Sequence, residues 1–209
     1  MSTRGASVGA ALMIVSVLGT PALAQEQASS SAETRTGREF RFGLEELKAT
    51  GNDRHLRTTN LDLLFRARKF EHPYLELYGG RTVSRARGTI TQITGSLQAG
   101  TLGNTTLDSA ATGAGPVLAA RAEFSRRKNF TASVDGSLSV LLYDRDFPAG
   151  GSRYEFMWRI RPVLSYRLND GQTLSLAYTG MHVSNGQSTS PHNPTYNAKG
   201  VGVQFLHAF

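Results

Sequence analysis

The chain has 209 residues, a formal net charge of +7 and no cysteine. This length suits one domain, and the lack of cysteine excludes the disulfide framework on which many small exported domains depend. A strongly basic chain is often a nucleic-acid binder, but the export signal described next argues against that partner and favours an anionic membrane surface.

Residues 1–24 have the pattern of a secretory signal peptide. Arg4 precedes a mostly apolar run at 8–19, and the small residues "ALA" stand before Gln25, which predicts cleavage after Ala24. A retained transmembrane helix is the alternative, although the run is shorter than the roughly 20 apolar residues that cross a bilayer. Residues 25–38 are polar and low in complexity, and they predict a flexible or weakly helical leader.

From Glu39 onward, apolar and polar residues alternate, which indicates β-strands because successive side chains of a strand point to opposite faces. The clearest case is "RYEFMWRIRPVLSYRL", where one face is apolar and the other carries Arg159 and Arg161. The pattern predicts eight strands, at 39–47, 60–68, 74–84, 116–124, 129–143, 153–168, 172–184 and 199–209.

The connections between these segments alternate in length. Those at 69–73, 125–129 and 168–172 are short, whereas those at 48–57, 85–115, 144–152 and 185–198 are longer. Such asymmetry is typical of a transmembrane barrel with tight periplasmic turns and long outer loops. A soluble β-sandwich or a lipocalin-like barrel would alternate similarly, but the Arg, Glu and Asp of the polar face suit a barrel lumen, and the terminal Phe209 suits an outer-membrane barrel.

We therefore expect residues 39–209 to form one all-β domain, an eight-stranded antiparallel transmembrane β-barrel of the bacterial outer membrane. Both termini of the barrel's chain should be periplasmic, so that the strand at 172–184 runs outward. The outward, lipid-facing set should include Leu174, Leu176, Tyr178, Val201, Val203 and Phe205.

The stretch "MHVSNGQS" at 181–188 lies near the outer end of that strand. By parity His182 and Ser184 share the apolar face with Leu176, and polar groups that face hydrocarbon are costly without partners. They can be simple rim residues in the headgroup zone. Alternatively, they form a hydrolase site, because residues two apart on a strand point the same way about 6.5–7 Å apart and a histidine can take the proton of a serine hydroxyl.

The motif "HVSNG" at 182–186 resembles the His-x-Ser-Asn motif of the outer-membrane lipid A 3-O-deacylases, the PagL-like family. The order of "PHNP" and then a Gly-rich last strand, "KGVGVQF", is similar too, and the resemblance covers about 154–209. It implies a serine esterase that hydrolyses the ester-linked 3-hydroxyacyl chain at position 3 of lipid A. Its residue roles would be Ser184 as nucleophile, His182 as general base, and Asn185 with a main-chain N–H of Gly186 or Gln187 as oxyanion donors.

The sequence departs from the family pattern in two places. Where the best-known members have a glutamate that orients the histidine, this chain reads "TYNAKG", and Asn197 has the parity to face lipid beside His182. Asn197 can instead be a turn residue, with Asp144 or Asp146 as the orienting group. The preceding strand lacks the family's asparagine and carries Phe156 and Trp158, which either line an acyl chain or belong to an interfacial aromatic belt.

The partners that follow are lipid A or lipopolysaccharide as substrate and the surrounding outer-membrane lipids. We expect no cofactor and no metal, because His55, His72, His192 and His207 have no metal-ligand spacing. A non-catalytic structural or adhesive barrel and an outer-membrane phospholipase remain alternatives, and the oligomeric state stays open, a homodimer included.

Overall fold

The computed structural model describes residues 38–70, 74–94, 103–186 and 194–209. The predicted signal peptide and nearly all of the predicted leader lie outside these residues, as do His72, Gln187 and His192. Within the described ranges, no helix is long and apolar enough to cross a membrane.

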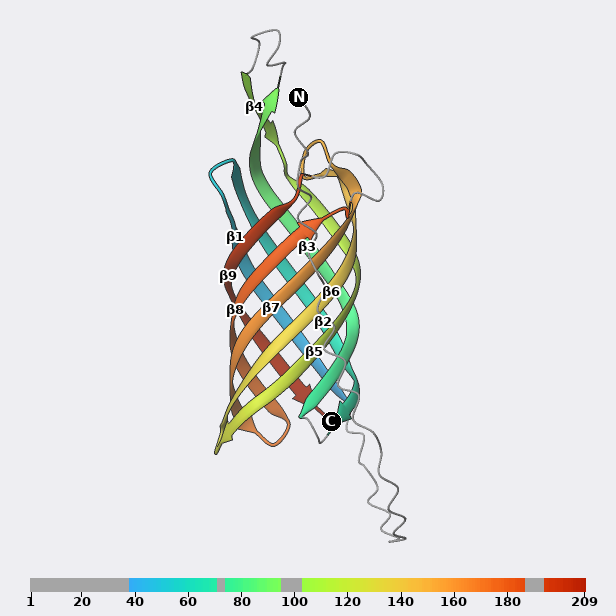
Figure 1. Ribbon diagram of the computed structural model, residues 1–209. Helices are drawn as coiled ribbons and strands as arrows, with labels where there is room; N and C mark the ends of the chain where they lie inside the picture. Colours follow the sequence, from blue (N-terminus) through green and yellow to red (C-terminus); the bar gives the residue numbers. More distant parts are fainter. Residues whose placement is uncertain (1–37, 71–73, 95–102, 187–193) are drawn as a thin grey trace, which may run out of the picture. The chain divides into compact units, whose positions relative to one another are not determined.

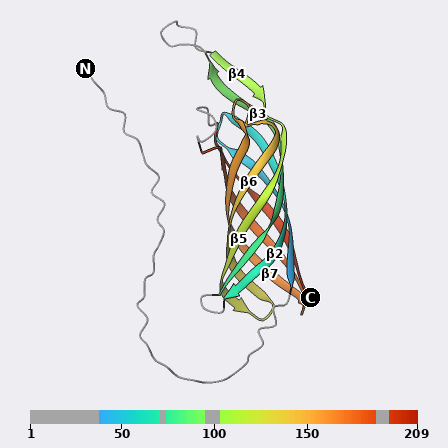
Figure 2. The same cartoon turned by 90° about the vertical axis from the view of Figure 1, so that its right-hand side faces the viewer.

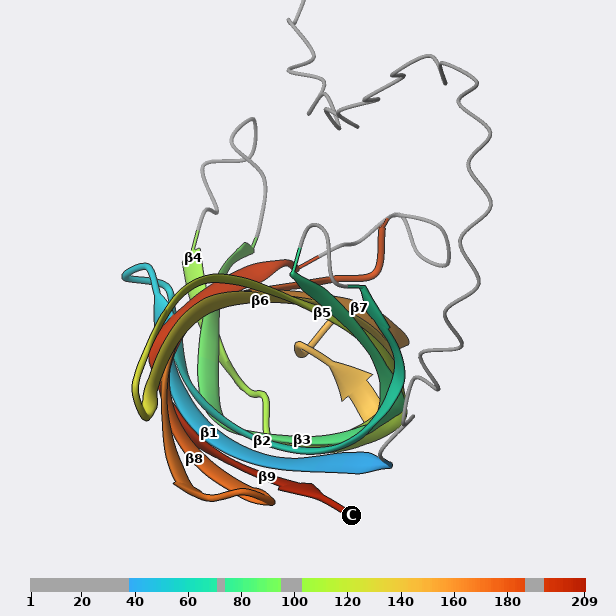
Figure 3. The same cartoon turned by 90° about the horizontal axis from the view of Figure 1, so that it is seen from below.

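Eight strands close into an antiparallel ring, in the order β1, β2, β3, β5, β6, β7, β8 and β9, with β9 paired back to β1 (Figures 1 and 3). Their bounds are Glu39–Thr50 for β1, Arg54–Phe70 for β2, Leu75–Thr94 for β3, Ala111–Arg127 for β5, Phe130–Phe147 for β6, Ser152–Asn169 for β7, Gln172–Ser184 for β8 and Tyr196–Ala208 for β9. The remaining strand, β4 (Gly103–Asp108), pairs with the end of β3 and projects beyond the ring (Figure 2).

The predicted barrel and its lipid-facing set are confirmed. Leu174, Leu176, Tyr178 and Val201 are exposed on the outer wall, and alternate residues such as Ser175 and Ala177 are buried in the lumen. An apolar exterior around a polar interior is the pattern of a barrel that lipid surrounds. We call the end that holds Glu39 and Phe209 the inner end and the opposite end the outer end.

The predicted outer connections were too long. Only Gly51–Asp53 separate β1 from β2, β3 continues to Thr94, and residues 111–115, which were predicted as part of the connection at 85–115, lie inside β5. Pairing continues at the outer end where outward residues are polar, so the alternation of apolar and polar residues stops before the strands do. β4 was missed for the same reason.

The middle and inner lumen are filled by buried ion pairs, as the charged inner face predicted. Arg159 pairs with Glu45 at 2.7 Å and with Asp62 at 3.0 Å. Nearer the inner end, Arg121 pairs with Asp135 at 2.7 Å. Buried charges need such partners, so the ion pairs hold together strands that are far apart in the chain.

The outer third of the lumen is apolar, which the sequence analysis did not predict. Phe147 stacks on Tyr143 with ring centroids 4.4 Å apart, and the segment after β6 folds inside the outline of the ring (Figure 3). The buried side chains of this cluster include Leu47, Leu56, Ile90, Leu141, Met157, Met181, Val183, Tyr196 and Ala198. Because several of them lie on β7, β8 and β9, the cluster supports from inside the wall that carries the candidate site.

Candidate functional site on the outer wall

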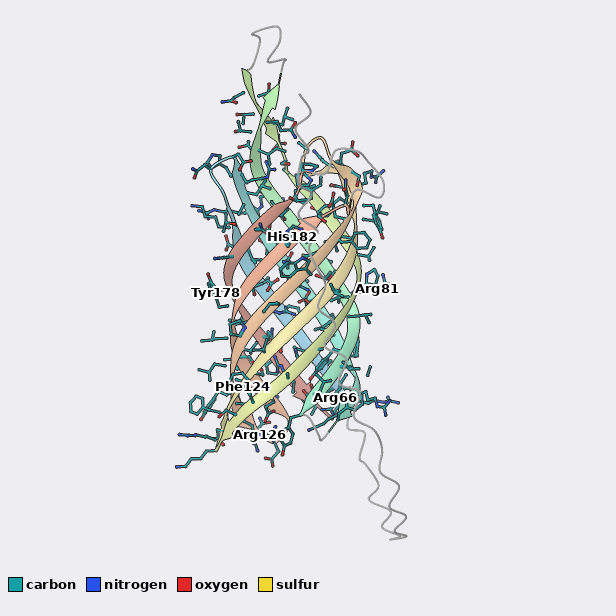
Figure 4. All side chains as sticks on the ribbon, in the orientation of Figure 1. Arg66, Arg81, Phe124, Arg126, Tyr178 and His182 are labelled. Carbon is teal, nitrogen blue, oxygen red and sulfur yellow. The ribbon has the colours of Figure 1, made fainter. Side chains whose placement is uncertain are left out.

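His182 and Ser184 lie near the outer end of β8, on its outward face, and both are half-buried. The residues between and beside them, Met181 and Val183, are buried in the apolar cluster. Figure 4 shows His182 on the outer half of the wall, above Tyr178. The fold therefore places His182 and Ser184 on the lipid-facing side, as expected.

The register of β8 and β9 places Asn197 directly opposite His182. The imidazole Nδ1 and the Asn197 Oδ1 are 2.8 Å apart. A carbonyl oxygen only accepts hydrogen bonds, so the proton of the neutral ring is on Nδ1 and the lone pair is on Nε2. Asn197 thus keeps His182 in the tautomer that a general base needs.

On the other side of β8, β7 brings Trp158 opposite His182 and Phe156 opposite Ser184. The Trp158 and His182 rings are stacked, with centroids 5.6 Å apart and an interplanar angle of 29°. The imidazole is therefore held by an amide from β9 and by an indole from β7. The sequence analysis placed Trp158 on this face but did not predict its contact with His182, which depends on the register between strands.

Ser184 ends β8 and enters a tight turn. The Gly186 N–H donates a hydrogen bond of 3.3 Å to the Ser184 Oγ, and Gly186 has a φ of 64°, a left-handed conformation that glycine adopts readily. Asn185 is fully buried, whereas Ser184 and His182 remain accessible. The third predicted oxyanion donor, Gln187, lies outside the described residues.

The alternative orienting groups, Asp144 and Asp146, lie on β6 and are exposed. Asp144 accepts a hydrogen bond of 3.1 Å from the Thr112 N–H of β5. The whole of β7 stands between β6 and β8 in the ring, so Asn197 is the residue that the structure brings to His182. In the described part of the chain, no three His, Cys, Asp or Glu side chains gather as a metal site would require.

β1 also reaches the site, through a contact that the sequence analysis missed. The Thr50 hydroxyl donates a hydrogen bond of 3.3 Å to the main-chain carbonyl of Asn197. Three neighbouring strands, β7, β8 and β9, therefore position one imidazole and one hydroxyl on the outer wall, and β1 contacts the main chain beside them. This arrangement combines a base with an available Nε2, a nearby hydroxyl and a main-chain N–H beside that hydroxyl, which are the parts of a serine hydrolase site.

Solved structures share the fold. The crystal structure of Neisserial surface protein A aligns with a TM-score of 0.54 and 12% identity, covering 83% of this chain and 98% of that one. The crystal structure of the outer membrane enzyme PagL aligns with a TM-score of 0.51 and 13% identity, covering 79% and 97%. At such identities the likeness establishes the outer-membrane barrel fold alone. No curated protein sequence matches the chain.

The family model described as lipid A 3-O-deacylase (PagL) matches residues 69–205. The match spans seven of the eight strands of the ring in whole or in part, from the end of β2 to β9, and it includes His182, Ser184 and Asn197. The chain thus belongs to the lipid A 3-O-deacylase (PagL) family.

Proposed function

We propose that the protein is a serine esterase that removes the ester-linked 3-hydroxyacyl chain from position 3 of lipid A in the outer leaflet. The observation that carries this proposal is the hydrogen bond of 2.8 Å between His182 Nδ1 and Asn197 Oδ1. It lies on the lipid-facing wall, and Ser184 is the next residue of β8 on the same face as His182. A rim histidine has no need of a fixed tautomer, whereas a general base does.

In the proposed reaction, the Ser184 hydroxyl turns toward Nε2 of His182 and loses its proton to it. The oxygen attacks the ester carbonyl carbon, and the carbonyl oxygen becomes an oxyanion. The tetrahedral intermediate then collapses: the sugar hydroxyl leaves with the proton from Nε2, and the acyl chain stays on Ser184. Water, deprotonated by the same Nε2, releases the 3-hydroxy fatty acid and restores the serine.

The turn after Ser184 would supply the oxyanion donors, with a main-chain N–H of Gly186 or Gln187 as the first candidate. Asn185 is the other candidate, but it is fully buried and its side chain would have to turn toward the lipid face to join that N–H. The Gly186 N–H already contacts the Ser184 Oγ at 3.3 Å. The oxyanion would be the carbonyl oxygen of the carbon that Oγ attacks, so only that carbon would lie between it and Oγ. A donor of this kind typically lowers the barrier by about 3–4 kcal/mol. Trp158 and Phe156, which are 42% and 41% exposed, would meet the acyl chains beside the ester.

The substrate would reach the site within the plane of the membrane. The half-buried His182 and Ser184 sit on the same face as exposed leucines, so an acyl chain in the outer leaflet is already next to them. The apolar cluster that includes Phe147, Met181 and Val183 fills the lumen behind the site, and the buried ion pairs fill it further toward the inner end. This leaves the lipid side as the route to Ser184.

The test is mass spectrometry of lipid A from a host with native lipopolysaccharide that expresses the full chain. We expect loss of one 3-hydroxyacyl group, and no loss with Ser184→Ala or His182→Ala. In a serine hydrolase either change costs about 10⁶-fold, and the double variant should be little worse than either single one because the two groups act as a unit.

Two matched variants serve as controls, since each removes the same chemical group from the outer wall elsewhere. Thr112→Ala removes an exposed hydroxyl from β5, and His55→Ala removes an exposed imidazole from β2. Both should deacylate at the wild-type rate. Unchanged lipid A with the wild-type chain would indicate a non-catalytic barrel, and substantial hydrolysis by Ser184→Ala would place the site elsewhere.

A further inference from the structure

Four basic side chains form one cross-strand row on the outer wall. Lys199 of β9 is opposite Lys48 of β1, Lys48 is opposite Arg57 of β2, and Arg57 is opposite Arg87 of β3. All four are exposed. We call Lys199, Lys48, Arg57 and Arg87 the cationic row.

The cationic row begins beside the candidate site. Lys199 follows Asn197 by two residues on the same face of β9, a separation of about 6.5–7 Å. Adjacent strands are about 4.8 Å apart, so the row extends about 14 Å along the wall, away from β8. Arg85 occupies the next outward position of β3 toward the inner end. Arg81 follows beyond Val83 on the same face and projects from the wall in Figure 4.

The positive charge of this surface is poorly balanced by the protein itself. Like charges directly opposite each other on neighbouring strands are destabilising. Among the described outward positions of β9, β1, β2 and β3, Glu46 is the one carboxylate. It contacts Arg57 at 3.7 Å, with both side chains largely exposed at 65% and 76%. An anion bound from outside would offset the repulsion among these four basic side chains.

The opposite half of the wall has no such surface. Beyond Arg127 at the inner end of β5, the described outward positions of β5, β6, β7 and β8 carry no Lys or Arg. Arg145 of β6 and Arg153 of β7 are exposed at the outer end, at positions that alternate with the outward ones, and both have partners: Arg145 lies 3.7 Å from Asp144, and Arg153 donates a hydrogen bond to the main-chain oxygen of Tyr143. Toward the outer end, the outward face of β7 carries Tyr154, Phe156 and Trp158, and β6 carries the exposed Asp144 and Asp146. A general adaptation to a headgroup layer would surround the barrel, so the one-sided charge indicates a ligand with a defined place relative to His182 and Ser184.

We propose that the cationic row binds the phosphate groups of lipid A and thereby sets which of its esters meets Ser184. The proposal rests on the function proposed above and adds how the head group is held. Arg57 and Arg87 can each hold a phosphate through two parallel N–H donors, and Lys48 and Lys199 act as point charges. With the phosphorylated sugar backbone on β9, β1, β2 and β3, the acyl chains extend over β8 and β7.

The experiment compares two substrates, lipid A with its phosphates and lipid A from which phosphatase has removed them. The variants are Lys48→Gln/Lys199→Gln and Arg57→Gln/Arg87→Gln, the second of which changes residues one and two strands beyond β1. The control Arg127→Gln/Arg167→Gln removes two exposed charges at the inner ends of β5 and β7. Each basic residue near an anionic lipid surface is worth about a fivefold change in affinity.

We expect each cationic-row double variant to raise KM for phosphorylated lipid A about 25-fold, with kcat unchanged. The same variants should have the wild-type KM for the dephosphorylated substrate, and the control should match the wild type on both. The proposal would be overturned if KM rose equally for both substrates, because the effect would then not depend on phosphate. It would also be overturned if KM rose for Lys48→Gln/Lys199→Gln alone, because the arginines of the row would then not contribute.

A binding measurement separates this proposal from the proposed catalysis. Trp158 is the one tryptophan of the chain and stacks on His182, so its fluorescence reports occupancy in a Ser184→Ala protein that does not turn over. Phosphorylated lipid A should bind this protein about 25-fold more tightly than it binds the same protein with Arg57→Gln/Arg87→Gln added. Equal competition by vesicles of phosphatidylglycerol would show a general anionic-lipid surface and refute the assignment to lipid A, whatever the outcome of the activity assay.

Discussion

The hydrogen bond between His182 and Asn197 leads to a quantitative prediction for Asn197→Ala. In the reaction proposed above, this bond joins two neutral groups before the proton transfer and is then worth about 0.5–1.5 kcal/mol. In the transition state the ring is an imidazolium, and bonds to charged groups are worth about 1.5–3 kcal/mol. The loss specific to the transition state is therefore about 1–1.5 kcal/mol, and kcat should fall about 5- to 13-fold with KM unchanged.

This loss is far smaller than that of removing the carboxylate from a Ser-His-Asp triad, which is about 10⁴-fold. The difference arises because the Asn197 amide orients the imidazole but carries no charge to stabilise it. Asn197→Asp places a carboxylate where the amide now lies, 2.8 Å from Nδ1. Since the position is exposed, we expect a gain of about 1 kcal/mol, or about fivefold in kcat.

The assay is the steady-state release of 3-hydroxy fatty acid from purified lipid A in detergent micelles. Thr50→Ala is the matched control, because it removes the bond of 3.3 Å to the main-chain carbonyl of Asn197 and leaves the side-chain amide in place. A wild-type kcat for Asn197→Ala, or a fall of 10³-fold or more, would refute this account of the third residue. Either result would show that the bond of 2.8 Å does not orient His182 with the energy assigned to it here.

Three further predictions concern the wall around the site. Trp158→Ala should lower kcat about 2- to 12-fold by removing the stack on His182, worth about 0.5–1.5 kcal/mol, while Trp158→Phe should retain most activity in the same assay. Arg159→Ala leaves Arg161 as the one arginine paired with the buried carboxylates of Glu45 and Asp62. One buried negative charge then lacks a positive partner, so the free energy of unfolding in urea should fall by about 3–5 kcal/mol; a loss below 1 kcal/mol would contradict the role of the buried pairs. Gly200→Ala should lower the free energy of unfolding by about 1–3 kcal/mol in the same experiment, because the added Cβ would lie 1.9 Å from a main-chain oxygen of β1. Gly136→Ala is the control and should lower it clearly less, because its Cβ would meet nothing within 4 Å.

The barrel and the side of its wall that carries the site could be predicted from sequence, because the two-residue period of a strand is a local property. Alternation in "TLSLAYTGMHVS" assigns His182 and Ser184 to the face of Leu176 without any knowledge of neighbouring strands. The same signal fails at the outer end, where residues on both faces are polar or both are apolar. It therefore missed β4, the full length of β3 and the apolar cluster around Phe147.

What stands next to His182 depends on the tertiary structure. The register between two strands follows from turn lengths and from the fit of side chains in the lumen, and a slip of one residue would move every side chain to the other face. The sequence placed Asn197 and Trp158 on the lipid side, but only the paired strands bring the amide to within 2.8 Å of Nδ1 and the indole against the ring. Closure of β9 on β1 likewise aligns Lys199 with Lys48, although about 150 residues separate them. Alternation is set within each strand, whereas neighbours across strands are set by the packing of the whole ring.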